Sequence, residues 1–188
     1  MEKRILVGAC CASGMPILLN CLQLIKQAGA HAELIFTPNA PQTLLAETGL
    51  APAQLTDLAD VIHEPDAIGA GPASGTYPTA GMLVVPCSMK TAAGICSGYS
   101  DDLLLRAADV TLKEGRPLVL APRETPLSAI HLRNLQQLAM LPGVRIIPPM
   151  MTFYHKPDSI EEMTYHIAAK LVEPFGIEAK EYRRWTGL

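Results

Sequence analysis

Residues 81–123 read GMLVVPCSMKTAAGICSGYSDDLLLRAADVTLKEGRPLVLAPR. They contain two short apolar runs, at 82–85 and 117–121, and each run leads into a polar turn and then into a helical pattern. Uninterrupted apolar runs of this length are typical of strands that are buried on both faces of a parallel sheet. The pattern therefore predicts two parallel strands whose following turns carry the polar chemistry.

The two polar turns carry groups that suit an anionic ligand. The first, 86–91, offers two hydroxyls, one ammonium group and the backbone N–H groups of a helix start. Such N–H groups bind anions because they are unpaired and lie at the positive end of the helix dipole. The second turn, 122–126, places Arg123 beside Glu124 between two prolines. We expect both turns to be walls of one site.

The remaining chain repeats the alternation of strand and helix. Further strands are predicted near 4–8, 32–36 and 144–147, and helices near 16–27, 127–141 and 159–172. The interval 60–77, rich in Gly, Pro and Ser, is expected to be a long connecting loop that is functional or mobile. The alternation predicts one α/β domain over 1–188, a Rossmann-like or flavodoxin-like parallel sheet with helices on both faces in three layers.

Ligands of such sheets bind outside the carboxyl ends of the strands, where every polar turn noted here is expected to lie. The turn at 9–16 is built from small residues and precedes a helix with Pro16 in its first turn, which is typical of a phosphate cradle. It lacks the GxGxxG pattern, so an ordinary tight turn is an equal alternative. Thr37 follows the strand at 32–36 and either caps the next helix, the commoner role, or contacts a ligand.

Composition limits the function classes. The 188 residues are 49% hydrophobic, enough for one core, and a net charge of -3 leaves no basic stripe for nucleic acid. The apolar runs are too short to cross a membrane, and no apolar signal region opens the sequence. The five cysteines are an odd number, so reduced thiols are expected. We therefore expect a cytoplasmic protein.

Taken together, these segments resemble the UbiX-type flavin prenyltransferases, within a wider group of flavoproteins that includes cysteine-type decarboxylases. The resemblance rests first on PCSMKT at 86–91 and PRETPL at 122–127, and it runs through most of the chain. Other matching segments are ASG at 12–14, ET at 47–48, LRAADV at 105–110, RPLVL at 116–120, FYHKP at 153–157 and RW at 184–185.

The resemblance implies an activity and an assembly. Reduced FMN would be alkylated at N5 by the dimethylallyl group of dimethylallyl monophosphate, and a ring would then close at C6 without a metal. The product, prenylated FMN, would pass to a UbiD-type decarboxylase. Members of the family form dodecamers built from trimers, with the flavin at a subunit interface. The tail at 178–188, which holds the sole tryptophan, is expected to dock on a neighbouring subunit.

The resemblance also assigns site residues. The FMN site would comprise Ala12, Ser13, Thr37, Ser88, Met89, Lys90, Thr91 and Arg123, with Cys11 beside them. The prenyl phosphate site would comprise Arg106, Lys113, Arg123, Glu124, Tyr154 and Lys170. The catalytic residues would be Glu124, Ser13, Glu47 and Lys113, and Trp185 would shield the allylic cation.

The chemistry is consistent with these residue types. Fixed cations and a phenol O–H stabilise a departing phosphate through charge-assisted hydrogen bonds. A carboxylate beside a phosphate is repelled unless it is protonated, so Glu124 is interpreted as the proton donor to the leaving phosphate. Ser13 and Glu47 are implied to move protons on the flavin during ring closure.

Without the resemblance, several of these residues have ordinary alternatives. Arg106 and Lys113 would be solvated residues of an amphipathic helix. Tyr154 would be a core residue, and Cys87 is interpreted as a small buried hydrophobe. His155 is expected to order its own loop.

Two residues depart from the family pattern. Cys11 stands where the family has glycine, and Lys170 stands where it has an arginine, which removes the bidentate fork. These departures motivate a second hypothesis, a non-catalytic carrier of FMN or prenylated FMN within a decarboxylase system. A third, weaker hypothesis is direct decarboxylation. The choice between monophosphate and pyrophosphate, and the decarboxylase that is served, stay open at this stage.

Overall fold

The computed structural model describes residues 3–187, so Met1, Glu2 and Leu188, the ends of the predicted domain and tail, lie outside the described residues. Its strands are β1 (Arg4–Ala9), β2 (His31–Phe36), β3 (Val61–His63), β4 (Met82–Cys87), β5 (Leu118–Pro122) and β6 (Val144–Ile146). They form one parallel sheet in the order β3-β2-β1-β4-β5-β6. The order reverses beside β1, and this confirms the predicted α/β class, a Rossmann-like or flavodoxin-like parallel sheet.

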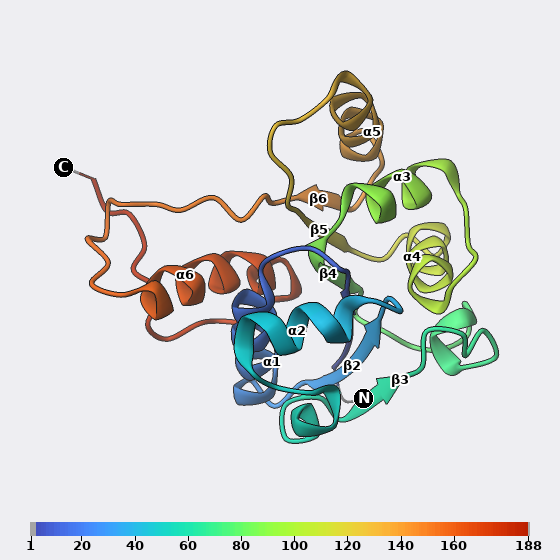
Figure 1. The fold of residues 1–188 in the computed structure, drawn as a ribbon, viewed down its shortest axis with the longest axis horizontal. Coiled ribbons are helices and arrows are strands. Elements are labelled where there is room, and N and C mark those ends of the chain that lie inside the picture. Colours follow the sequence, from blue (N-terminus) through green and yellow to red (C-terminus); the bar gives the residue numbers. More distant parts are fainter. Residues whose placement is uncertain (1–2, 188) are drawn as a thin grey trace.

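Helices cover both faces of the sheet (Figure 1). They are α1 (Met15–Gln27), α2 (Ala40–Thr48), α3 (Met89–Ser97), α4 (Leu103–Lys113), α5 (Ala129–Ala139) and α6 (Ile160–Val172), with short 3-10 turns η1 (Pro52–Leu55), η2 (Gly71–Ala73) and η3 (Glu173–Phe175). One buried cluster joins α1, α2 and α6 to one face, and a second joins α3, α4 and α5 to the other. The result is the three-layer arrangement expected from the sequence.

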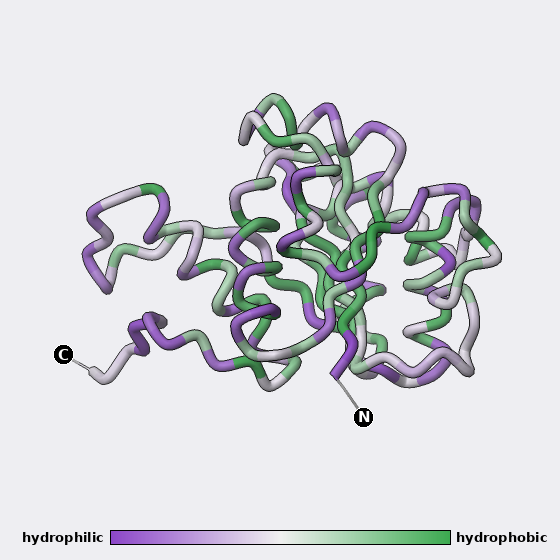
Figure 2. The backbone as a smooth tube through the Cα atoms, turned by 90° about the horizontal axis from the view of Figure 1, so that it is seen from below, coloured by the Kyte–Doolittle hydropathy of each residue, from purple (hydrophilic) through white to green (hydrophobic). Residues whose placement is uncertain are grey.

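The central strands are apolar on both faces because both faces are covered. Every residue of β4 is buried, and alternate residues of β1 enter opposite clusters: Val7 faces α1 and α6, whereas Leu6 faces α4. Figure 2 shows this as a band of hydrophobic chain through the centre of the molecule. Two segments extend beyond α6 on the same side in both views, the loop after β6 and the C-terminal tail.

Side-chain caps fix where several helices begin. Ser88, Asp102, Ser128 and Ser159 each accept a hydrogen bond from the backbone N–H three residues later. Such caps pair N–H groups that have no partner within the helix.

The prediction of a structureless loop at 60–77 was wrong in two respects. Val61–His63 forms the edge strand β3, which pairs with β2, and Gly71–Ala73 forms η2. The rest of the segment is held in place, since Arg116 donates to the carbonyl oxygens of Gly75 at 2.7 Å and Tyr77 at 2.8 Å. The segment is therefore an ordered connection, fixed by a side chain that is distant in sequence.

A buried carboxylate links this connection to the sheet. Glu33 of β2 is fully buried, and its carboxylate lies 2.7 Å from Arg4 Nε, 2.7 Å from His63 Nε2 and 2.5 Å from the Tyr77 hydroxyl. Burial raises the pKa of a carboxyl, but the hydrogen bonds from His63 and Tyr77 and the charges of His63 and Arg4 outweigh it, so the pKa of Glu33 is lowered.

Within residues 3–187, no helix combines the length and the apolar character that crossing a bilayer requires. The same residues contain no group of three or more His, Cys, Asp or Glu side chains placed to hold a metal ion.

Candidate functional site

The turns after β1, β4 and β5 lie side by side at the carboxyl edge of the sheet. The backbone N–H of Cys10 donates to the Pro86 carbonyl at 3.1 Å, and that of Arg123 donates to the Cys87 carbonyl at 3.0 Å. The expectation that the 86–91 and 122–126 turns adjoin is confirmed. The β1–α1 turn, with Ala12 and the exposed Ser13, completes the same edge.

The start of α3 is arranged around hydroxyl groups. Ser88 Oγ accepts from the Thr91 N–H at 3.2 Å and donates to the Thr91 hydroxyl at 3.1 Å. Thr91 is buried, so its side chain supports the turn from inside, whereas the N–H groups of Met89 and Lys90 have no partner within the helix. The Lys90 ammonium lies 3.9 Å from Asp102 at the start of α4, and its side chain is mostly exposed.

Replacing Ser88 with alanine should destabilise the protein by about 1 kcal/mol, because the Thr91 N–H loses its cap. Urea denaturation of the purified protein measures this change. The matched control is Ser97→Ala at the far end of α3, where the hydroxyl donates to the Gly94 carbonyl. That control should stay within about 0.5 kcal/mol. Equal effects of the two substitutions would contradict the role given to Ser88.

Glu47 reaches across from α2 to the start of α1. Its carboxylate accepts from the N–H groups of Gly14 at 2.9 Å and Met15 at 2.8 Å. Partial burial raises the pKa of this carboxyl, but these bonds, a hydrogen bond from Ser13 and the charge of Arg123 outweigh it, and the pKa is lowered. The carboxylate is therefore ionised near neutral pH and can accept a proton through Ser13. This carboxylate already occupies the start of α1, whereas the start of α3 has N–H groups without a partner in the helix.

Thr37 does not cap α2. The residue that precedes the helix is Asn39, which makes no side-chain cap, and Thr37 contributes only its carbonyl oxygen, which accepts from the Ala40 N–H at 3.0 Å. Thr37 is buried after β2, near the predicted FMN site. Contact with a ligand stays a prediction for this residue.

Cys10, which precedes Cys11, was not predicted as a site residue. Its thiol is fully buried and donates to the Thr91 hydroxyl at 3.2 Å. A hydrogen bond with the buried Cys87 thiol holds the pKa of Cys10 below its ordinary value, against the effect of burial. The signal was available, because Cys10 and Cys87 end adjacent parallel strands. Cys11, by contrast, is exposed, and its thiol lies 3.4 Å from the Thr43 hydroxyl.

Arg106 and Lys113 both belong to α4, outside the turns described above. Arg106 donates to the Ala73 carbonyl at 3.2 Å and to Asp109 at 2.7 Å, so it faces η2. Lys113 pairs with Glu114 at 2.7 Å at the end of α4, just before β5 begins. The five residues of β5 span roughly 17 Å between that end and Arg123. Within one chain, Lys113 therefore lies at the opposite edge of the sheet from Arg123 and Glu124.

Tyr154, Lys170 and Trp185 form a third group, at the C-terminal side. Tyr154 is not a core residue, since it is 78% exposed, and its ring lies 5.2 Å from that of Trp185. Both rings border a hollow of about 380 Å³. Lys170 borders an adjoining hollow of about 230 Å³ and pairs with Glu173 at 2.6 Å.

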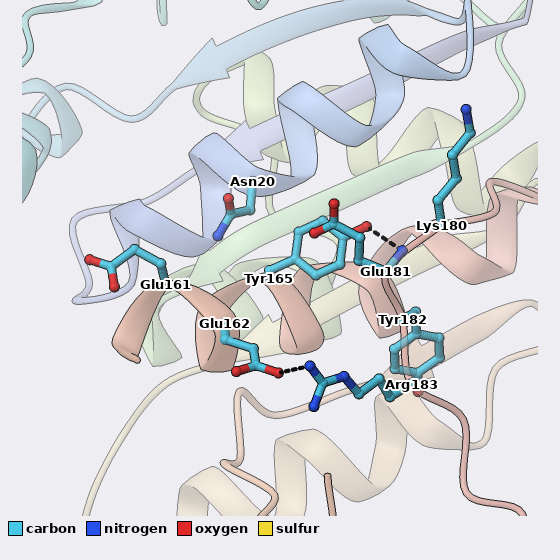
Figure 3. A pocket seen from close by; sticks show the side chains of 8 residues that line it. All are labelled: Asn20, Glu161, Glu162, Tyr165, Lys180, Glu181, Tyr182 and Arg183. Carbon is cyan, nitrogen blue, oxygen red and sulfur yellow. Dashed lines mark hydrogen bonds and ion pairs between the residues drawn. The ribbon is translucent and has the colours of Figure 1, made fainter. Parts of the chain in front are cut away.

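A further pocket, of about 550 Å³, lies between α1, α6 and the tail (Figure 3). Its lining residues are Asn20, Glu161, Glu162, Tyr165, Lys180, Glu181, Tyr182 and Arg183. None of these was predicted as a site residue. The pocket marks where the tail crosses the body of the molecule (Figure 3). Two contacts hold the tail there: Arg183 forms an ion pair with Glu162, and the Glu181 N–H donates to the Tyr165 hydroxyl.

Comparison with known proteins supports the grouping by sequence. The family model described as Flavoprotein matches residues 1–172. The chain is 46% identical over 186 residues to the flavin prenyltransferase LpdB of Lactiplantibacillus plantarum, which covers 98% of this chain and 99% of that protein.

Two solved structures share the whole fold. A dodecameric FMN-dependent UbiX-like decarboxylase from Escherichia coli O157:H7 superposes with a TM-score of 0.95 at 42% identity, covering 98% of this chain and 100% of that one. AnUbiX (PadA1), solved with FMN and dimethylallyl pyrophosphate, superposes with a TM-score of 0.97 at 38% identity and covers 100% of both chains.

Proposed function

This chain belongs to the flavoprotein family and is a UbiX-like flavin prenyltransferase, and we propose that the carboxyl edge of its sheet binds FMN while cations of a neighbouring copy bind the prenyl phosphate. The observation that supports this division is the separation of the expected site residues over three surfaces of one chain. The product is prenylated FMN, which we propose passes to a UbiD-type decarboxylase.

The carboxyl edge fits the phosphate of FMN. The free N–H groups at the start of α3 and the exposed guanidinium of Arg123 supply donors and positive charge. The small turn at Ala12 and Ser13 lets the backbone approach the ligand closely. Reduced FMN supplies the nucleophilic N5, and the remaining chemistry belongs to the side chains around it.

Different side chains would carry out the two proton transfers, one to the leaving phosphate and one from the flavin. Glu124, beside Arg123 and exposed at the edge, would donate a proton to the phosphate as it leaves. Arg123, beside Glu124, would add positive charge near both phosphates, and cations of the neighbouring copy would hold the one that leaves. Glu47, ionised and linked to Ser13, would accept the proton that ring closure releases.

The direct test is anaerobic incubation of the protein with reduced FMN and either dimethylallyl monophosphate or dimethylallyl pyrophosphate, followed by mass spectrometry of the flavin. One added five-carbon unit is the expected result. Release of unmodified FMN from protein that demonstrably binds it would favour the carrier hypothesis instead. We place this activity in the cytoplasm, because the five cysteines are all free and suit a reducing compartment.

We propose that the complete site forms between copies of the chain, and the relative that is 42% identical is dodecameric. Lys113→Ala and Glu124→Gln should then each inactivate homogeneous assemblies. Mixed assemblies of the two variants should regain activity at about one quarter of their sites, since random mixing unites an intact Glu124 with a neighbour's intact Lys113 at that frequency. Co-expression with two affinity tags isolates the mixed species for a prenylation assay.

The matched control mixes Arg123→Ala with Glu124→Gln. These residues are adjacent in one chain, so no mixed site can contain both intact side chains from different copies. Recovery in this control, or none in the first mixture, would contradict an intersubunit site.

A further inference from the structure

A ladder of aromatic rings holds the C-terminal side of the molecule together. His155, in the loop after β6, stacks on His166 of α6 with ring centroids 3.9 Å apart and planes 10° from parallel. His166 in turn packs on Tyr182 of the tail at 4.5 Å. Three segments that are separate in sequence therefore meet through one stack.

Hydrogen bonds around the stack fix the state of both histidines. His166 Nε2 lies 3.2 Å from the Arg183 carbonyl oxygen, which can only accept, so Nε2 carries a hydrogen. Neutral His166 then accepts at Nδ1 from the Thr152 hydroxyl, 3.4 Å away. The Thr152 oxygen is left to accept from His155 Nδ1, also at 3.4 Å.

This chain of donors leaves His155 Nε2 as a bare lone pair. That atom is buried, and it has no hydrogen-bond partner within residues 3–187. A proton added there would be an N–H without an acceptor, and a proton added at His166 Nδ1 would displace the Thr152 hydroxyl. The arrangement is complete only while both rings are neutral.

The charges around the two rings are mixed. From α6, Glu162 and Lys170 face them; from the tail, Tyr182, Arg183 and Arg184 do so; and Tyr154 lies beside His155 in its own loop. Glu162 pairs with Arg183 at 3.3 Å, and Glu173 pairs with both Lys170 and Arg184. The nearest carboxylate is thus already engaged and is not free to stabilise a second imidazolium.

The same contacts position two residues of the proposed site. Arg183 donates to the His155 carbonyl at 3.1 Å, which ties the tail to the loop. Directly beside this tie, Tyr154 of the loop meets Trp185 of the tail. The positions of both aromatic side chains therefore depend on the contacts among His155, His166 and Arg183.

We propose that Thr152, His155, His166 and Arg183 form a clasp that positions Tyr154 and Trp185 for prenyl transfer while His155 is neutral and releases them when His155 is protonated. The positioning role rests on the function proposed above for Tyr154 and Trp185. The clasp itself rests on the geometry of this chain alone.

The direction of the pH effect follows from His155. Burial and the neighbouring His166 lower the pKa of His155, so the folded clasp favours the neutral ring. A group of this kind stabilises the folded form at pH values above its ordinary pKa of about 6.5, and the stabilisation is lost as the pH falls below that value. Acid therefore opens the clasp.

The sole tryptophan makes the test specific, because Trp185 fluorescence reports on the tail alone. In flavin-free protein, its anisotropy should fall as the pH is lowered from 8 to 5, with a midpoint below about pH 6.5. The double variant His155→Asn, His166→Gln keeps an amide N–H near each required donor position but does not titrate. It should keep high anisotropy throughout. His131→Gln on the remote helix α5 should behave as the parent does.

The outcomes are distinct. The clasp is overturned if the Trp185 anisotropy of the parent protein shows no transition with pH. It is also overturned if the double variant still shows that transition. Matching the anisotropy series with prenylation rates at each pH tests the positioning role: the double variant should lose less activity between pH 7.5 and 5.5 than the parent. Identical activity profiles beside different anisotropy profiles would overturn positioning. Absence of prenylation by the parent at every pH would be a failure of the proposed function instead.

Discussion

Replacing Glu124 with glutamine is expected to slow flavin prenylation by about 10²–10⁴-fold, the range for removal of a general acid. Glutamine keeps the size of the side chain and can still accept the hydrogen bond that Glu124 receives from the Thr125 N–H at 3.2 Å. It has no proton to give to the departing phosphate. The loss should therefore appear in kcat, measured by the rate of prenylated FMN formation under saturating prenyl phosphate.

FMN binding separates this effect from damage to the site. Since Glu124 is exposed at the edge of the turn, Glu124→Gln should bind FMN as the parent does, measured by quenching of flavin fluorescence. Glu64→Gln, an exposed carboxylate beside the edge strand β3, is the matched control and should retain most of the activity. A Glu124→Gln enzyme with normal kcat would remove Glu124 from the proton-donor role.

The arrangement of the sheet could be predicted because most of its strands are short apolar runs between turn residues. The exception is β3, whose three residues carry no apolar pattern of their own. Val61 is exposed, and the strand exists because it pairs with β2 and because His63 contacts the buried Glu33. Both are tertiary contacts, which a local pattern does not contain.

The residues of the candidate site could be predicted from the sequence, but their positions on the surface of one chain could not. The turns after β4 and β5 adjoin because parallel strands bring their carboxyl ends to one edge. Lys113 shares a helix with Arg106, and because β4 and β5 are parallel that helix returns the chain to the amino edge of the sheet, far from Arg123. The contacts of His166 with His155 and Arg183 had no sequence signal, because the three residues meet only through the loop and the tail.

Glu33→Ala is expected to cost roughly 3 kcal/mol of folding free energy, the lower end of the range for breaking a buried charged pair. The lower end applies because the Arg4 and His63 side chains retain some access to solvent, so they are not left as fully buried charges. The loss should also loosen the connection before β4, since Tyr77 donates to the same carboxylate. Urea denaturation at pH 7 measures the cost, and hydrogen exchange at residues 71–79 measures the loosening.

The pH dependence gives this prediction a second, independent check. Because the folded pKa of Glu33 is lowered, its stabilisation is present above the ordinary carboxyl pKa of about 4.3 and is lost as the pH falls through the lower folded value. The gap in stability between parent and Glu33→Ala should therefore narrow below about pH 4. Glu64→Ala, an exposed carboxylate next to β3, should change stability by no more than about 0.5 kcal/mol. If Glu33→Ala were no worse than that control, Glu33 would not be what joins β2, β3 and the Tyr77 segment.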